Sequence, residues 1–198
     1  MGNGMGHLEV VGMMKSYVDL KKEISKLAVR KKKMAACIEF VGIITEMMSE
    51  HKIKPIVTGG LAIEIYTRSG YHIDDIDIMV KNSNLLKSIL DKLELVMAGR
   101  YWYSEAIDVG VDIFSLDPKV SLDRLSRIKL ISGREIYVIG FEDLIINRLN
   151  NYYQFNSVFD YEWAYRIYKI HKGSMDIDYL LEKSAELNDG AVEMISKW

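Results

Sequence analysis

Two aspartates inside an apolar run constrain this chain more than any other feature of its sequence. The run from Asp75 to Val80, DIDIMV, alternates acidic and aliphatic residues before it becomes wholly apolar. Residues i and i+2 of a β-strand point to the same face of a sheet. The sequence therefore predicts a strand that buries Ile76 and Ile78 and projects Asp75 and Asp77 side by side from the other face.

A glycine pair precedes this acidic strand. Residues 56–58 predict a short strand, Gly59-Gly60 a tight turn, and residues 61–68 a helix. The first backbone N–H groups of a helix are unpaired and favour an anion, and glycine lets a phosphate approach the backbone closely. This order predicts a phosphate site beside a pair of carboxylates, although a Gly-Gly pair that simply turns the chain is the structural alternative.

A later β-prone run supplies a third acid. Asp112 lies between Val111 and Ile113, where a carboxylate is costly unless it is paired or bound to metal. If this strand lies beside the first acidic strand, at about 4.8 Å, three carboxylates converge. Such a group favours a divalent cation and suits two-metal phosphoryl or nucleotidyl transfer. Asp108 is a rival for the role of Asp112, or a supporting acid.

The composition places the chain among ordinary globular proteins. Of its 198 residues, 49% are hydrophobic and 27% charged, which suits one large domain or two small ones. The net charge of −2 gives no general attraction to nucleic acid or membrane. A single cysteine, Cys37, fits a reducing cytoplasm. We expect no signal peptide and no membrane-spanning helix.

Hydrophobic periodicity supplies the remaining elements. The further predicted elements are helices at 8–30, 34–51, 85–93, 142–152, 157–171, 176–186 and 191–197, and strands at 95–98, 101–103, 107–114, 127–131 and 134–139. We expect an α+β fold in which helices flank a mixed β-sheet. Its parts are an N-terminal helical extension (1–52), a catalytic core (53–140) and a C-terminal helical part (141–198).

A basic run and an aromatic run each allow a structural and a functional interpretation. The lysines and arginines between residues 21 and 33 form either a solvated helix face or a phosphate-binding patch. Six aromatic residues of the C-terminal part form either a helical core with phenolic tips at the surface or a surface that stacks a base. These residues are Tyr152, Tyr153, Tyr161, Trp163, Tyr165 and Tyr168. The four histidines are too scattered to suggest a zinc site.

The motifs around residues 58–60, 75–77 and 111–113 together resemble the signature of the nucleotidyltransferase superfamily of the DNA polymerase β type. The sequence of residues 59–80 looks most like those of a small prokaryotic branch that includes the AbiEii-type toxins. Residues 141–145 are similar to a segment found in that branch. The chain departs from it in a spacer of 14 residues (61–74), in Asp74 before the first acid, and in Arg148 where a lysine is usual.

The resemblance implies roles for particular residues. Asp75 and Asp77 would bind two Mg²⁺ ions, with Mn²⁺ as the alternative, and Asp112 would bind the ion that activates the acceptor. The segment from Thr58 through Gly59 to Gly60 would hold the phosphates of the nucleotide. Arg148 would contribute a further phosphate contact.

The resemblance also implies an activity, which is transfer of a nucleoside monophosphate from an NTP such as ATP to a hydroxyl. The acceptor would be an RNA end such as that of tRNA, a protein or a small molecule, and a cognate antitoxin is an expected partner. The main alternative is a catalytically silent binding or regulatory protein on the same fold, such as one partner of a toxin–antitoxin pair. A metal-dependent phosphohydrolase is a weaker alternative, because no histidine–aspartate cluster is present.

Overall fold

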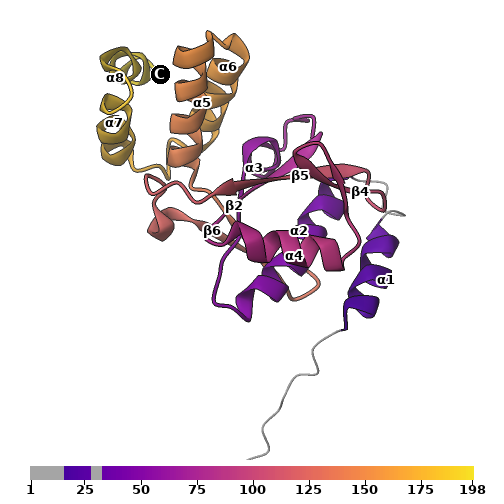
Figure 1. Ribbon diagram of the computed structural model, residues 1–198. Coiled ribbons are helices and arrows are strands. Elements are labelled where there is room, and N and C mark those ends of the chain that lie inside the picture. Colours follow the sequence, from indigo (N-terminus) through magenta and orange to yellow (C-terminus); the bar gives the residue numbers. More distant parts are fainter. Residues whose placement is uncertain (1–15, 28–32) are drawn as a thin grey trace, which may run out of the picture.

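The computed structural model describes residues 16–27 and 33–198 (Figure 1). Within these residues a seven-stranded mixed sheet is flanked by eight helices, which confirms the predicted α+β fold. The helices are α1 (Tyr17–Leu27), α2 (Lys33–Ser49), α3 (Gly59–Thr67), α4 (Ser83–Lys92), α5 (Phe141–Phe155), α6 (Val158–His171), α7 (Ile177–Ala185) and α8 (Asp189–Ser196). The strands are β1 (Ile56–Thr58), β2 (Asp75–Val80), β3 (Val96–Ala98), β4 (Tyr101–Ser104), β5 (Val109–Ser115), β6 (Ser126–Lys129) and β7 (Glu135–Val138).

The predicted elements agree with the observed ones, with boundaries that differ by a few residues. One short 3₁₀ helix, η1 (Leu122–Arg124), was not predicted. The first helix begins in the described residues at Tyr17. Positions 8–15 and 28–30 of that predicted helix lie outside the described residues, as does most of the basic run that follows it.

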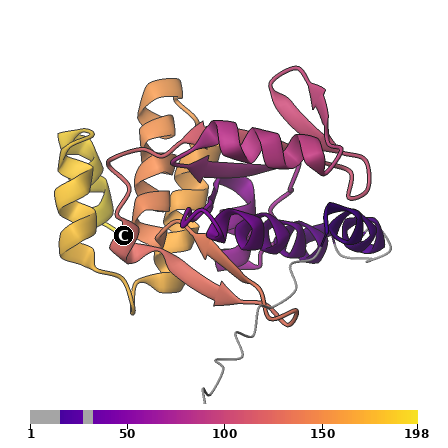
Figure 2. The same cartoon turned by 60° about the horizontal axis from the view of Figure 1, so that its bottom comes forward.

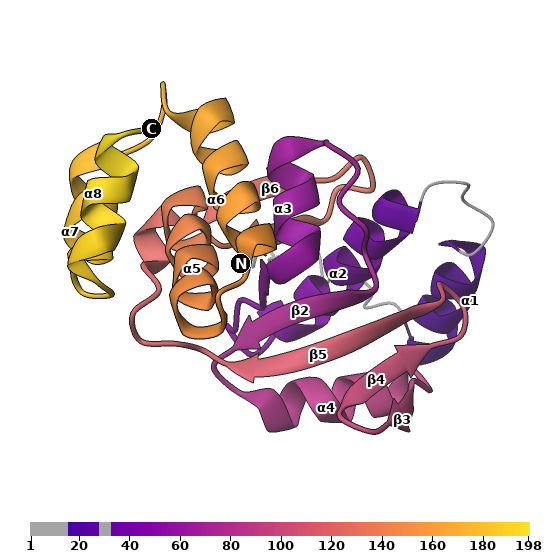
Figure 3. The same ribbon diagram turned by 90° about the horizontal axis from the view of Figure 1, so that it is seen from above.

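The strand order places the acidic strands at the centre of the sheet. The order is β3-β4-β5-β2-β1-β7-β6. Strand β2 is antiparallel to β1 and parallel to β5, and Figure 3 shows β2, β5 and β4 side by side. Ile76 and Ile78 of β2 are fully buried, as are Phe40 and Ile44 of α2. Burying such side chains stabilises the fold by about 1.5–3 kcal/mol each.

A buried arginine fastens the N-terminal helices to the β6–β7 hairpin. The Arg134 guanidinium contacts the Glu23 carboxylate of α1 at 2.5 Å and the Glu46 carboxylate of α2 at 2.6 Å. Only 8% of Arg134 is exposed, and the Glu23 side chain is partly buried whereas that of Glu46 is exposed, so water screens the contact with Glu23 less than the contact with Glu46. Helices α1 and α2 are thereby held against the sheet.

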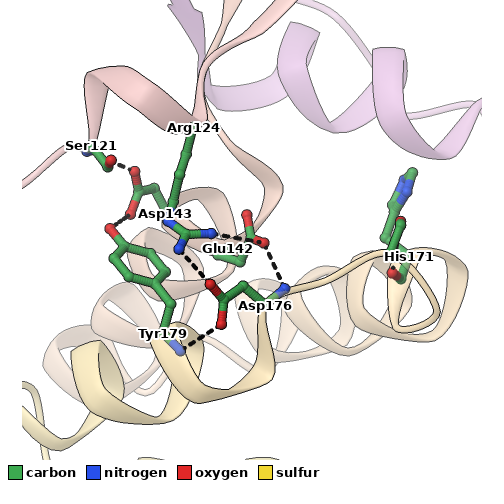
Figure 4. Close-up of polar contacts among 8 residues, drawn as sticks. Ser121, Arg124, Glu142, Asp143, His171, Asp176 and Tyr179 are labelled. Carbon is green, nitrogen blue, oxygen red and sulfur yellow. Dashed lines mark hydrogen bonds and ion pairs between the residues drawn. The ribbon is translucent and has the colours of Figure 1, made fainter.

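Helices α5–α8 gather on one side of the molecule, and α1 lies at the other (Figures 1 and 2). Two buried acids at the start of α5 attach these helices to the core. Asp143 accepts hydrogen bonds from the Ser121 backbone N–H at 3.0 Å and the Tyr179 hydroxyl at 2.6 Å, and Glu142 accepts one from the Asp176 backbone N–H at 3.0 Å. We call this network the α5 brace (Figure 4); its members are Ser121, Arg124, Glu142, Asp143, Asp176 and Tyr179.

The aromatic run of the C-terminal part divides into two groups. Most of its tyrosines pack around the last residue, Trp198, whose ring centroid lies 5.9 Å from that of Tyr161 and 5.2 Å from that of Tyr168. Trp163 instead faces the core, with its ring 4.9 Å from that of Tyr71. The first group supports the interpretation of a helical core, whereas Trp163 packs against the loop between α3 and β2.

The helices of residues 16–27 and 33–198 fall short of the length and apolarity that a bilayer span requires.

Candidate active site

Three predicted acids meet at the centre of the sheet. Asp77 of β2 and Asp112 of β5 are direct register partners, and Asp75 is the partner of Gly110. Neighbouring strands are about 4.8 Å apart, so Asp77 and Asp112 lie side by side. Only 6% of Asp112 is exposed, while Asp75 and Asp77 are partly buried. The two motifs are 35 residues apart along the chain, and the parallel β2–β5 pairing brings them together.

The closeness of these carboxylates changes their titration. Burial raises the pKa of Asp77 to about 6, and the charges of Asp75 and Asp112 add to the rise. The positive charge of Arg148 and a hydrogen bond from the Gly60 backbone N–H oppose it. The pKa of Asp75 is also raised, first by burial and then by the charge of Asp112. The cluster therefore holds its negative charge at a free-energy cost that a bound cation would relieve.

The glycine turn lies directly against the cluster. Thr58, at the end of β1, is the register partner of Asp77. Gly59 has a φ of +59°, and a Cβ atom built on it would stand 1.6 Å from Asp77 Oδ2. Only glycine fits this position, because any side chain would collide with the carboxylate. Helix α3 begins at Gly59, two residues before the predicted start.

Arg148 lies near the cluster but already has a partner. Its Nη1 atom donates to Asp160 Oδ1 at 2.8 Å, and Asp160 is 9% exposed. The buried Nε atom of Arg148 has no hydrogen-bond partner. Its charge reaches Asp77, since it lowers the pKa of that carboxyl. Arg148 is thus held by α6 at the edge of the site with one donor unused.

The rival acid Asp108 occupies a different setting. It lies in the turn before β5, is exposed, and has a φ of +50°. Its carboxylate accepts a hydrogen bond from the Tyr103 hydroxyl. The register of β2 and β5 pairs Asp77 with Asp112, so Asp112 is the better-placed third acid.

The sequence did not single out Arg100, which contacts the third acid. Arg100 lies in the β3–β4 turn, and its Nη2 atom lies 3.2 Å from Asp112 Oδ2. This ion pair lacks hydrogen-bond geometry, so Asp112 Oδ2 has no hydrogen-bond partner. The same Nη2 atom donates to the Tyr101 hydroxyl at 2.6 Å. Only the pairing of β4 with β5 brings Arg100 here, and no local pattern marks it.

A second unpredicted residue is Tyr71, in the loop between α3 and β2. A Cβ atom on Gly60 would lie 2.6 Å from Tyr71 Cε1, so the ring packs directly on the glycine turn. Burial raises the pKa of the Tyr71 phenol, which keeps it protonated and able to donate a hydrogen bond at neutral pH. No spacing in the sequence marks this contact.

The cluster has the donor chemistry of a divalent-cation site. Among the described residues, no three His, Cys, Asp or Glu side chains are already arranged around one metal position. However, Asp112 Oδ2 is buried without a hydrogen bond, and carboxylate oxygens are the ligands that Mg²⁺ prefers. The residues fit Mg²⁺ in kind, and binding would require the Arg100 ion pair with Asp112 to open.

A cavity of about 660 Å³ lies elsewhere, between the end of α2 and the β6–β7 hairpin. Its lining includes Thr45, Lys54, Arg134 and Tyr137, but neither the glycine turn nor any of the three acids. Volume alone does not mark a reactive site, whereas converging carboxylates with raised pKa values do. We therefore assign the candidate active site to the acidic cluster.

The fold is shared with solved nucleotidyltransferase structures. A solution structure of the antibiotic-resistance factor ANT(2'')-Ia aligns with a TM-score of 0.55 at 15% identity, over 81% of this chain and 95% of that one. ANT(2'')-Ia in complex with adenylyl-2''-tobramycin aligns with a TM-score of 0.52 at 17% identity, over 76% and 95%. An antigenic nucleotidyltransferase-like protein from Paracoccidioides brasiliensis gives 0.50 at 14% identity, over 90% and 93%.

Comparisons with protein-family models and with curated proteins give no match. The similarity to known proteins is therefore one of fold. It rests on alignments that span most of this chain and nearly all of each solved one. On that evidence, the chain has the nucleotidyltransferase fold.

Proposed function

We propose that this protein is a metal-dependent nucleotidyltransferase. The observation that carries the proposal is the direct contact of the Gly59 turn with Asp77, opposite Asp112. A triphosphate on that turn would lie beside carboxylates suited to binding cations. In the reaction, the acceptor oxygen forms a bond to the α-phosphorus, the bond from that phosphorus to the β-phosphate oxygen breaks, and pyrophosphate leaves. The acceptor hydroxyl gives up its proton to solvent water.

The position of each residue in the site indicates its role in this reaction. Asp75 and Asp77 would hold the cations that bind the triphosphate, and Asp112 would lie on the acceptor side. Bound Mg²⁺ supplies neutralisation of phosphate charge and a lower pKa for the acceptor hydroxyl. The backbone N–H groups after Gly59 would donate to phosphate oxygens. Arg148, with its free Nε donor, would contribute positive charge at the edge of the site.

Two considerations bear on the donor and the acceptor. ANT(2'')-Ia, which has the same fold, was solved with adenylyl-2''-tobramycin, which favours ATP as the donor and a small molecule as the acceptor. The resemblance of residues 59–80 to the AbiEii-type branch favours an RNA end or a protein, together with a cognate antitoxin. We therefore propose ATP first among donors and test all three acceptor classes.

One observation favours a second candidate, a catalytically silent binding protein. The Arg100 guanidinium lies 3.2 Å from Asp112 Oδ2, so a positive charge of the protein itself stands beside the third acid. A silent site of this kind would not bind Mg²⁺ and NTP together. Calorimetric titration of ATP in the presence and absence of Mg²⁺ separates the two candidates.

The decisive experiment incubates the protein with each labelled NTP, Mg²⁺ and total cellular RNA. The Asp75→Ala/Asp77→Ala variant is the control. Label on RNA or on the protein itself, in the wild type alone, would establish transfer and name the acceptor class. ATP binding without label would direct the search to small-molecule acceptors. Absence of both label and ATP binding would refute the enzyme and favour the silent candidate.

A further inference from the structure

Three apolar side chains stand exposed at the turn between α5 and α6. Phe155, Val158 and Phe159 are 73%, 59% and 55% exposed. We call them the α5–α6 wall. Single exposed apolar residues need no explanation, but a group of three on one turn indicates a binding surface.

The wall is connected to the glycine turn through tilted and edge-to-face contacts between aromatic rings. The Tyr71 ring packs on Gly60, and its centroid lies 4.9 Å from that of Trp163 and 5.8 Å from that of Phe159. The Phe159 and Trp163 centroids are 6.2 Å apart. Helix α6, which carries Phe159 and Trp163, lies alongside α3, which begins with the glycine turn (Figure 3). A row of aromatic rings thus runs from the proposed phosphate site to an open phenyl ring.

The charges around this row suit a nucleotide. The Arg166 guanidinium lies 4.6 Å from the centroid of the Trp163 ring, and the nearby acid Asp160 is neutralised by Arg148. The surface is therefore aromatic, with one guanidinium, that of Arg166, over one of its rings. A flat base attached to phosphates fits such a surface, because bases stack on aromatic side chains and arginine adds a cation–π contribution.

We propose that Phe159 is the stacking platform for the base of the incoming nucleoside triphosphate. This inference rests on the proposed function. Tyr71 positions the platform relative to the glycine turn, so a nucleotide whose phosphates lie on Gly59 and Gly60 places its base over the exposed phenyl ring. Every base has a π-face, so stacking alone discriminates weakly among bases. The four NTPs should therefore bind with affinities within a few-fold of one another.

The test compares ATP with inorganic tripolyphosphate, which has the phosphates but no base. The Kd of each with Mg²⁺ is measured by calorimetry for the wild type, Phe159→Ala, Phe159→Leu and Phe159→Trp. Stacking on one aromatic ring predicts that Phe159→Ala weakens ATP binding about 5- to 160-fold, while tripolyphosphate binding is unchanged. Phe159→Leu should lose most of the affinity for ATP, and Phe159→Trp should retain it. Ile131→Ala, at an apolar residue of the β6–β7 turn that is even more exposed than Phe159, is the control and should change neither Kd.

Each other outcome overturns the inference in a recognisable way. If Phe159→Ala leaves ATP binding unchanged, the base lies elsewhere, and the proposed function stands. If it weakens ATP and tripolyphosphate equally, Phe159 is a structural residue of the site. If the wild type binds neither ligand, the proposed function falls together with the platform, and the wall must serve another partner. Phe159→Leu keeps an apolar side chain and provides the test should Phe159→Ala fail to fold.

Discussion

Two groups of buried acids in this molecule have opposite surroundings. In the α5 brace, Asp143 has a backbone N–H and a phenol as donors, and Glu142 has a backbone N–H together with the nearby guanidinium of Arg124. In the acidic cluster, Asp112 Oδ2 has no hydrogen bond, and Asp77 has like charges beside it and a pKa of about 6. Carboxylates in the brace have hydrogen-bond donors, whereas those in the cluster lie beside like charges.

The difference separates acids that hold the fold together from those of the candidate active site. A buried carboxylate that receives several hydrogen bonds stabilises the fold. A buried carboxylate beside other carboxylates destabilises the fold unless a ligand supplies positive charge. Substitutions in the two groups should therefore change activity and stability in opposite ways, and the following predictions run from the largest expected effect to the smallest.

If the proposed function holds, Asp77→Asn should abolish transfer, with a loss of at least about 10³-fold, because the charge proposed to bind metal beside the triphosphate is removed. The same change should raise the free energy of unfolding at pH 7, since a carboxylate under repulsion is replaced by a neutral amide of equal shape. Labelled-NTP assays and denaturant unfolding check the two parts. Retention of near-normal activity would remove Asp77 from the catalytic group.

Gly59→Ala should inactivate the protein and lower its free energy of unfolding by more than about 2 kcal/mol. Two effects combine at this position: alanine is strained at a positive φ, and its Cβ would lie 1.6 Å from Asp77 Oδ2. Gly70→Ala is the matched control, with a φ of +78° and no atom within 4 Å of its Cβ. It should cost only the backbone strain, about 1 kcal/mol, and leave activity unchanged. Equal effects at both positions would show that backbone strain alone explains the requirement for glycine.

Asp143→Ala should lower the free energy of unfolding by about 2–4 kcal/mol, because two donors lose their buried acceptor. Activity per folded molecule should remain within a few-fold of the wild type. Urea unfolding and activity assays below the melting temperature measure the two quantities. A thousandfold loss of activity without loss of stability would make Asp143 a member of the site rather than of the brace.

The acidic cluster should also make stability depend on pH. Between about pH 4 and 6 the folded state keeps a proton on Asp77 that the unfolded chain has released, because the folded pKa is about 6. The folded state then binds more protons, so stability falls as pH rises through this window, by about 1–3 kcal/mol. Unfolding in EDTA at several pH values measures this slope for the wild type and for Asp77→Asn. The fall should be smaller in the variant, and an identical slope in both proteins would contradict the assignment of the raised pKa.

Local pattern singled out the acids that the β2–β5 pairing brings together. Alternation predicted that Asp75 and Asp77 share a face, and an acid in an apolar strand predicted a special role for Asp112. Pattern could not find Arg100 or Tyr71. Each reaches the cluster through a contact between elements, the β4–β5 pairing for Arg100 and the packing of a loop on Gly60 for Tyr71.

The sequence by itself determined the order of the elements, the glycine turn and the positions of the acids, because periodicity, turn chemistry and side-chain direction are properties of neighbouring residues. Only the tertiary structure decided that Asp112 rather than Asp108 is the partner of Asp77, and that Glu142 and Asp143 of α5 belong to a brace. Strand register and the supply of hydrogen-bond donors depend on residues far apart in the chain. Packing therefore determines whether a buried acid receives hydrogen bonds or lies among like charges.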